Sequence, residues 1–194
     1  MKKTSVTILL IAAVIIMAWG SSAYNSMVKV QESATTALAN VQSAYQRRAD
    51  LIPNLVETVK GYASHEKETL EGVVNARAKA TSITLDAESL TPEKMQEFQK
   101  AQSDLSGALG RLIAVGEAYP DLKANDNFRE LQVQLEGTEN RINEARNTFN
   151  KTVQDYNVAV RRFPKNLIAG MFGFDTMAKF EAEAGAQKAP EVKF

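Results

Sequence analysis

The chain has 194 residues, enough for one domain with a core, and its 44% hydrophobic and 24% charged residues are typical of a folded protein. Lys plus Arg and Asp plus Glu both number 23, so the formal net charge is zero, which argues against a nucleic-acid-binding protein with its usual basic surplus. Cysteine is absent, which excludes disulfides, thiolate metal sites and a lipid-modified N-terminal cysteine.

An uncharged apolar run opens the chain. Val6–Trp19 is rich in Ile, Leu and Ala and follows Lys2 and Lys3. Residues 4–23 supply about 20 residues, the length that a helix needs to cross a ~30 Å hydrocarbon core. The sequence therefore predicts a single-pass membrane protein with a transmembrane signal-anchor over residues 1–23. The two lysines favour a cytoplasmic N-terminus, which would place the bulk of the chain on the periplasmic or extracellular side.

A cleaved signal peptide is the alternative to a retained anchor. Ser21 and Ala23 are small residues at plausible cleavage positions. Helical patterning continues past Ala23 without a spacer, which favours a retained anchor.

Residues 24–81 are predicted to form one long helix, because apolar residues recur there at three- and four-residue spacing. Pro53 interrupts the pattern, but no turn residues accompany it, so we expect a kink rather than a reversal. A reversal would return the C-terminal tail to the membrane, whereas a continuous helix would leave that tail far from it. The apolar positions are Leu38, Val41, Tyr45, Ile52, Leu55, Val59, Tyr62, Leu70 and Val73.

A second helix is predicted to follow a loop at residues 81–90. Thr91 is a good cap, Pro92 suits the first turn, and Pro120 ends the helix. Glycines inside this helix indicate the close approach of another helix, either in the core or between subunits. They are Gly107, Gly110 and Gly116.

A third helix, from about Asp126 to Phe163, carries a seven-residue apolar repeat. Asn125 is its predicted cap and Pro164 closes it. Because an α-helix has 3.6 residues per turn, this repeat forms one narrow stripe and predicts side-by-side helix packing with a left-handed twist. The repeat consists of Phe128, Leu135, Ile142, Phe149, Tyr156 and Phe163.

Residues 164–194 are predicted to be an apolar segment and a tail. The segment is too short to span a bilayer, and three roles stay open for it: to cap the bundle, to dip into a lipid surface, or to pack on another copy. A last short helix is expected over Asp175–Ala184, followed by a loosely ordered end at residues 185–194. The candidate lipid or subunit contacts are Phe163, Leu167, Ile168, Met171, Phe172 and Phe174.

These elements together predict an all-α fold. The N-terminal transmembrane helix leads into a long antiparallel helical bundle over residues 24–163, made of three long helices, with a short helix near the C-terminus.

Catalytic and metal chemistry have little support in the sequence. The single histidine, His65, precedes Glu66, but Thr69 stands where a zinc-protease helix needs its second histidine. No nucleophile-elbow sequence surrounds a serine, and no glycine-rich phosphate loop is present. We therefore predict no catalytic residues, no metal site and no cofactor, and a protein that is not an enzyme.

Arg48 falls on the apolar stripe of the first predicted helix. A charge at such a position either pairs with an acidic residue of the third helix, which is the favoured interpretation, or faces a neighbouring subunit. The candidate interface or register residues are Arg47, Arg48, Asp50, Gly107, Gly110, Glu117, Glu139 and Arg146.

Motifs along nearly the whole chain resemble the LemA family. Residues 47–63 read RRADLIPNLVETVKGYA and precede His65-Glu66. The resemblance implies a bacterial membrane protein with an N-terminal transmembrane helix and a helical bundle. It also implies an outside N-terminus, the opposite of what Lys2 and Lys3 favour, and it supplies no catalytic residues to assign to this chain. Further matches are Leu105–Leu112, Glu117–Asn125, Asn127-Phe128, Glu139–Ile142, Ala145-Arg146, Tyr156-Asn157, Phe163-Pro164, Asn166–Gly170 and Phe172–Phe174.

The resulting functional hypothesis is a membrane-anchored bundle that contacts the lipid bilayer and forms a homo-oligomer, a scaffold that organises the membrane. Long heptad surfaces also bind partner helices, so the alternative is an adaptor for another membrane protein. A nucleic-acid partner is not expected.

Overall fold

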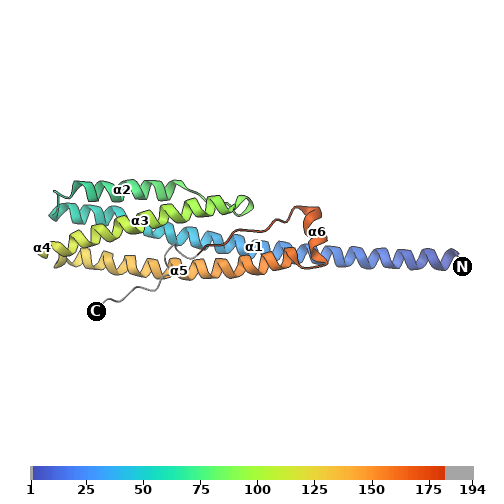
Figure 1. Cartoon of the computed structure of the whole chain (residues 1–194). Helices are drawn as coiled ribbons and strands as arrows, with labels where there is room; N and C mark the ends of the chain where they lie inside the picture. Colours follow the sequence, from blue (N-terminus) through green and yellow to red (C-terminus); the bar gives the residue numbers. More distant parts are fainter. Residues whose placement is uncertain (1, 182–194) are drawn as a thin grey trace, which may run out of the picture.

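The structure is a computed structural model that describes residues 2–181. This part of the chain folds into α-helices and one short 3-10 helix without strands, which confirms the predicted all-α fold. Four long helices lie side by side, and the N-terminal part of the first projects alone beyond them (Figure 1). The helices are α1 (Lys2–Tyr62), α2 (Lys67–Ser82), α3 (Pro92–Ala118), α4 (Pro120–Lys123), α5 (Asp126–Arg161) and α6 (Lys165–Phe172).

Helix α1 has 61 residues and joins the apolar run to the bundle without a break. At 1.5 Å per residue it is about 90 Å long. It is long and apolar enough to cross a membrane, and the apolar side chains of Val6–Trp19 are exposed. Beyond them α1 becomes a core helix, in which Val41 and Leu55 are buried. Pro53 lies inside α1 and the chain does not reverse there, as predicted.

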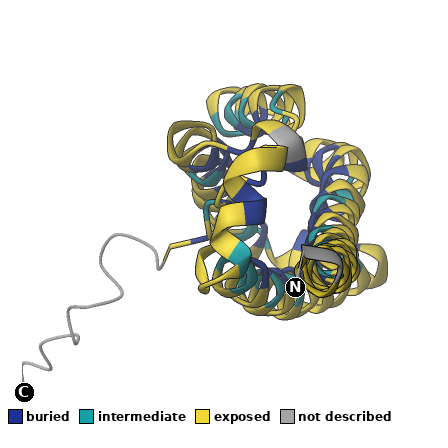
Figure 2. Ribbon diagram, turned by 90° about the vertical axis from the view of Figure 1, so that its right-hand side faces the viewer, coloured by how far each residue is buried: buried dark blue, intermediate teal, exposed yellow. Residues whose placement is uncertain are grey.

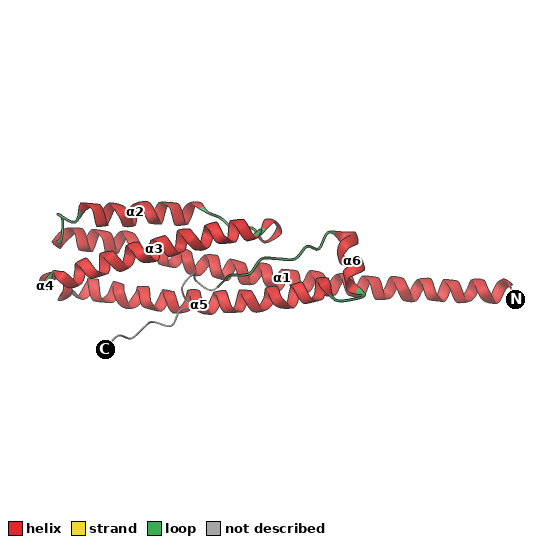
Figure 3. Cartoon of the chain, in the orientation of Figure 1, coloured by secondary structure: helices red, strands yellow, loops and turns green. Residues whose placement is uncertain are grey.

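The predicted continuation of this helix to residue 81 is wrong, because the chain reverses at residues 63–66. Ala63 still donates its backbone N–H to Val59, and Glu66 then donates to Ala63 over 3.1 Å, which closes a tight turn. Helix α2 folds back beside α1 and buries Leu70 and Val73, which a straight helix would leave without helix neighbours. The bundle therefore has four long helices rather than three, and α5 returns toward the N-terminal part of α1 (Figure 3).

The predicted caps of the two later helices are present. The Thr91 hydroxyl accepts a hydrogen bond from the backbone N–H of Lys94 at the start of α3. The Asn125 side chain accepts one from the N–H of Phe128 over 3.0 Å at the start of α5. The predicted loop before α3 contains one turn of 3-10 helix, Ala87–Ser89.

The apolar stripe of α5 is used for packing within the chain. Its first five members are at most 7% exposed, from Phe128 to Tyr156, whereas Phe163 is 75% exposed. Seen along the bundle axis, the buried residues of the helices face the middle of the bundle (Figure 2). The first five stripe residues are therefore not available to another copy, and the exposed apolar residues of α5, Val133 and Val158, lie outside the stripe.

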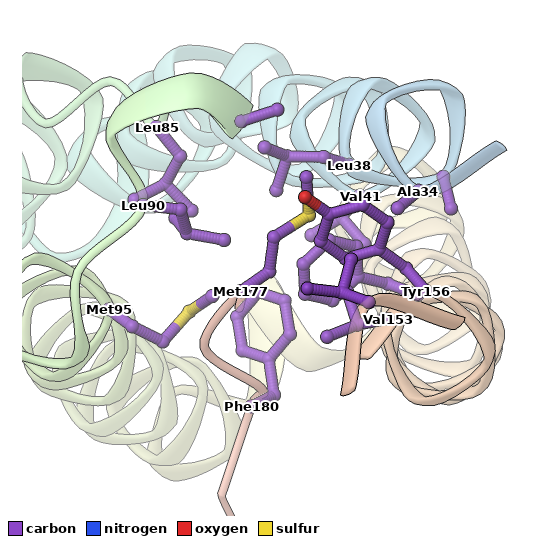
Figure 4. Packing of buried hydrophobic residues seen from close by; sticks show 14 of the residues in the cluster. Ala34, Leu38, Val41, Leu85, Leu90, Met95, Val153, Tyr156, Met177 and Phe180 are labelled. Carbon is purple, nitrogen blue, oxygen red and sulfur yellow. The ribbon is translucent and has the colours of Figure 1, made fainter. Parts of the chain in front are cut away.

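The core consists of two clusters along the bundle. The distal cluster, farther from the N-terminal run, lies between Ile52 and Leu135 in the sequence. The proximal cluster combines α1, α3 and α5 with Met177 and Phe180 from beyond α6 (Figure 4). This entry of the C-terminal segment into the side of the core differs from the three roles predicted for the segment.

The short helix predicted at Asp175–Ala184 is absent over residues 175–181, which are extended. Helix α6 lies earlier instead and ends at Gly173, whose φ of 73° is favourable for glycine. The extended form is stabilised because Met177 and Phe180 enter the core while side chains of α5 bind the backbone. The rest of the predicted helix and residues 185–194 lie outside the described residues.

The helix-interior glycines of α3 differ from one another. A Cβ atom at Gly116 would overlap the ring of Phe128, so the expected close approach exists there. Gly110 has open space around it, and a Cβ at Gly107 would meet only an arginine tip, Nη1 of Arg111, at 4.0 Å. No other helix comes close to these two glycines within the chain. Their role between subunits stays a prediction.

Gly116→Ala should lower the free energy of unfolding by about 1–3 kcal/mol, because the new methyl group displaces the ring of Phe128, which is 1% exposed. Gly137→Ala is the control, since nothing lies within 4 Å of that glycine in α5. The control should raise stability by about 0.5–1 kcal/mol through helix propensity. Urea unfolding followed by circular dichroism measures both, and a stabilised Gly116→Ala variant would contradict the packing described.

Candidate functional site

Helix α6 lies crosswise at the end of the bundle from which the N-terminal part of α1 emerges (Figure 3). The rings of Tyr24 and Phe172 meet edge to face, with 5.0 Å between their centroids. Lys165 donates from Nζ to the hydroxyl of Ser26 over 2.8 Å. These contacts fasten α6 to α1 just after the apolar run ends.

Exposed apolar side chains on α6 and just before it form a surface that we name the basal patch. Phe163 is 75% exposed, Met171 79%, and Leu167 and Phe172 60% each. Two of the six candidate contact residues, Ile168 and Phe174, are instead buried in the proximal cluster. The large exposed apolar residues on the distal bundle, such as Val133, are scattered along separate helices.

Basic residues border the basal patch. Arg161 and Arg162 precede Phe163 in the sequence and Lys165 follows it, and residues 161–175 include one carboxylate, Asp175. Both arginines are exposed. The segment that contains α6 is therefore apolar and, with three cations against one carboxylate, positively charged.

A polar network crosses the middle of the bundle at Arg48, which is 3% exposed. Its Nη1 donates to Glu139 Oε2 and to the hydroxyl of Ser106, both over 2.9 Å. Its Nη2 donates to Gln102 Oε1 over 2.8 Å, and Gln102 donates in turn to the carbonyl of Ala80 in α2. One guanidinium thus connects four helices, and Arg48 pairs within the chain with an acidic residue of α5.

The other candidate register residues form no hydrogen bond of this network. Arg47 and Glu117 are exposed, and Asp50 accepts a hydrogen bond from Gln46 one turn earlier. Arg146 lies over the ring of Phe180, with its guanidinium carbon 5.1 Å from the ring centroid. Their predicted role between subunits remains a prediction.

Residues 173–181 form an extended segment along α5, which we name the C-terminal strap. Asn157 pairs with the backbone of Met177, accepting its N–H and donating to its carbonyl, both over 2.9 Å. Asn150 does the same for Phe180 over 2.8 and 2.9 Å. The asparagines stand seven residues apart, so they lie on one face of α5 and bind the strap at two points.

A crevice beside the network has a volume of about 410 Å³ and lies between α1, the end of α2 and α3. Tyr45, Phe98 and Leu105 line it together with amide and hydroxyl side chains such as Gln42 and Thr84. No carboxylate, amine, guanidinium or imidazole lines this crevice. Residues 2–181 also contain no group of three His, Cys, Asp or Glu side chains able to hold a metal ion.

The distal end of the bundle gathers further residues that carry the resemblance noted above. Tyr119 donates from its hydroxyl to Glu66 Oε1 over 3.2 Å, and this bond, together with desolvation, raises the pKa of the Tyr119 phenol. Asn125, the cap of α5, donates to the hydroxyl of Tyr62 over 3.0 Å. These bonds join the turn between α1 and α2 to the turn before α5, which is a structural role.

Sequence reasoning missed several residues of these sites. Gln102 and Ser106 complete the network, and Asn150 and Asn157 bind the strap. A signal existed for the asparagines, since each follows a stripe residue, Phe149 or Tyr156, by one position. No comparable signal marks Gln102, because its polar neighbours in α3 face solvent.

Comparison with known proteins gives consistent results. The model described as "LemA family" matches residues 37–194. Magnetosome protein MamQ of Magnetospirillum gryphiswaldense is 26% identical over 182 residues, which cover 84% of this chain and 66% of that protein. Magnetosome protein MamQ 2 of Paramagnetospirillum magneticum is 27% identical over 177 residues, 81% of this chain and 64% of that protein.

A protein from a different bacterium matches as well. Protein LemA of Metamycoplasma hominis is 25% identical over 158 residues, which cover 81% of this chain and 68% of that protein. The chain thus spans less than two thirds of the length of the magnetosome proteins that it matches.

Arg48→Ala should lower the free energy of unfolding by roughly 2–4 kcal/mol, because Gln102, Ser106 and Glu139 all lose their shared donor. Arg47→Ala, its exposed neighbour, should change stability by no more than about 0.5 kcal/mol. Thermal unfolding of both variants measures the difference. Similar effects at the two positions would contradict a structural role for the network.

Asn150→Ala and Asn157→Ala should each speed chymotrypsin cleavage within the strap by about tenfold, because each removes two hydrogen bonds to its backbone. Asn147→Ala, at an exposed position of the same helix, is the matched control. Mass spectrometry of the fragments gives the cleavage rates. An unchanged rate in both variants would mean that apolar packing alone holds the strap.

Proposed function

The chain belongs to the LemA family, and on that premise we propose that it is a membrane-anchored structural protein whose copies assemble side by side into a scaffold that organises the membrane. The proposal includes a non-enzymatic role and a homo-oligomer. It also places the bundle outside the cytoplasm.

One observation carries the proposal: α1 passes from the apolar run into the bundle as a single helix. An adaptor that searches for a partner gains reach from a flexible tether, which Gly- and Ser-rich linkers supply. Here Ala23 and Met27, the first buried residues of α1, follow the apolar run almost directly. The orientation of the membrane helix is therefore imposed on the whole bundle, as a scaffold requires.

The cross-links inside the bundle support the same role. Arg48 connects α1 to α3 and α5, and Arg77 of α2 donates to the carbonyl of Ala49 in α1 over 2.8 Å. A rod with such bonds at its middle resists sliding of its helices against one another. Such a rod transmits the angle at which it leaves the membrane to its far end.

The composition favours assembly. A formal net charge of zero weakens repulsion between neighbouring copies.

The test is a flexible insertion between Tyr24 and Asn25, two exposed residues that follow residues 4–23 directly and precede the buried Met27. Seven Gly and Ser residues should leave the bundle folded and anchored but abolish the ordered assembly, because they uncouple the bundle from the membrane helix. A seven-residue Ala-rich helical insertion keeps the coupling and is the control. Chemical crosslinking in membranes and electron microscopy of reconstituted vesicles measure the assembly.

A chain that stays monomeric in membranes would contradict the proposal, as would an assembly that the flexible insertion leaves unchanged. Recovery of a second membrane protein in stoichiometric amount with a monomeric chain would favour the adaptor instead.

A further inference from the structure

We infer that the basal patch is an interaction surface for an anionic lipid bilayer, and that α6 lies in the headgroup region beside the point where α1 leaves the membrane. The inference uses the membrane anchor of the proposed function but does not depend on assembly of copies. Four observations lead to it.

The first observation is the apolar character of α6 on both sides. Its inner side packs on α1 and the proximal cluster through Ile168 and Ala169, which are 9% and 2% exposed. Its outer side presents Leu167 and Met171, 60% and 79% exposed. A helix that is apolar all round is covered on every side in a stable protein. Residues 2–181 leave the outer side uncovered.

The second observation is the level at which α6 lies along α1. Residues 4–23 match the thickness of a hydrocarbon core, so Tyr24 marks its surface. The ring of Phe172 packs on Tyr24, and Lys165 bonds Ser26. When the N-terminal part of α1 spans a bilayer, α6 is therefore held at the boundary between acyl chains and headgroups.

The third observation is the orientation of α6. It lies across the axis of α1 rather than along it, so it runs along the surface of a bilayer that α1 crosses (Figures 1 and 3). A helix in that plane inserts one apolar side into the acyl boundary and leaves polar groups among the headgroups.

The fourth observation is the charge. Arg161, Arg162 and Lys165 lie within or beside the patch in the sequence, and residues 161–175 contain one carboxylate side chain, Asp175, against these three cations. Basic residues next to a membrane segment favour anionic lipids. The same cations disfavour a second copy as the occupant, because a patch placed against its own equivalent would bring six cations together.

The test uses tryptophan fluorescence of the full chain in vesicles, because the chain has one tryptophan, Trp19. Lipids brominated near the headgroup quench a tryptophan that touches them. Native Trp19 reports on the anchor, Trp19→Phe/Met171→Trp reports on the patch, and Trp19→Phe/Val133→Trp reports on the distal bundle. We expect quenching at positions 19 and 171 but not at 133.

Lipid preference is measured at position 171 in mixed vesicles that carry bromine on only one lipid. Brominated phosphatidylglycerol should quench the fluorescence of the tryptophan at position 171 at least about twofold more than brominated phosphatidylcholine at the same mole fraction. The reason is that the three cations attract anionic lipid to the patch. Arg161→Gln/Arg162→Gln/Lys165→Gln should remove this preference. The matched control removes three exposed positive charges far from the patch: Lys60→Gln/Lys123→Gln/Arg129→Gln. This control should keep the preference for phosphatidylglycerol.

Two results would overturn the inference. One is an unquenched tryptophan at position 171 while native Trp19 is quenched. The other is equal quenching by the two brominated lipids. An unquenched Trp19 would instead contradict the membrane anchor of the proposed function. Failure of the anchor and failure of the patch can therefore be distinguished.

Discussion

The structure depends on one constraint: a buried guanidinium at Arg48 must find its hydrogen-bond partners. Arg48 stands between Tyr45 of the proximal cluster and Ile52 of the distal cluster, where the two apolar cores meet. Its partners lie on α3 and α5, so a shift of either helix by one turn would leave a cation without them. Apolar packing alone tolerates such a shift more easily, because a heptad stripe repeats itself.

The predictable part of this fold was the part encoded by local chemistry. Thr91 and Asn125 marked two helix starts because a cap is satisfied within four residues. The stripe of α5 indicated which residues enter the core, and five of its six members do. The acidic partner that Arg48 was expected to find on this helix is Glu139.

The features that escaped prediction depend on contacts distant in sequence. The turn at residues 63–66 has no Gly, Pro or Asn, and contacts distant in sequence favour it: the burial of Leu70 and Val73 on other helices and the hydrogen bond from Tyr119 to Glu66. The strap is extended because Asn150 and Asn157 bind its backbone, and no local pattern in residues 173–181 encodes those partners. Because this turn was not predicted, the C-terminal tail was expected to lie far from the apolar run, whereas α6 lies next to it.

The division of the core into two clusters imposes an order on folding during synthesis. The distal cluster uses only residues between Ile52 and Leu135, so it is complete once the first half of α5 has left the ribosome. The proximal cluster is complete only after Met177 and Phe180 have left the ribosome. During synthesis, all residues of the distal end of the rod are thus available for packing before the last core residues of the end that carries α6.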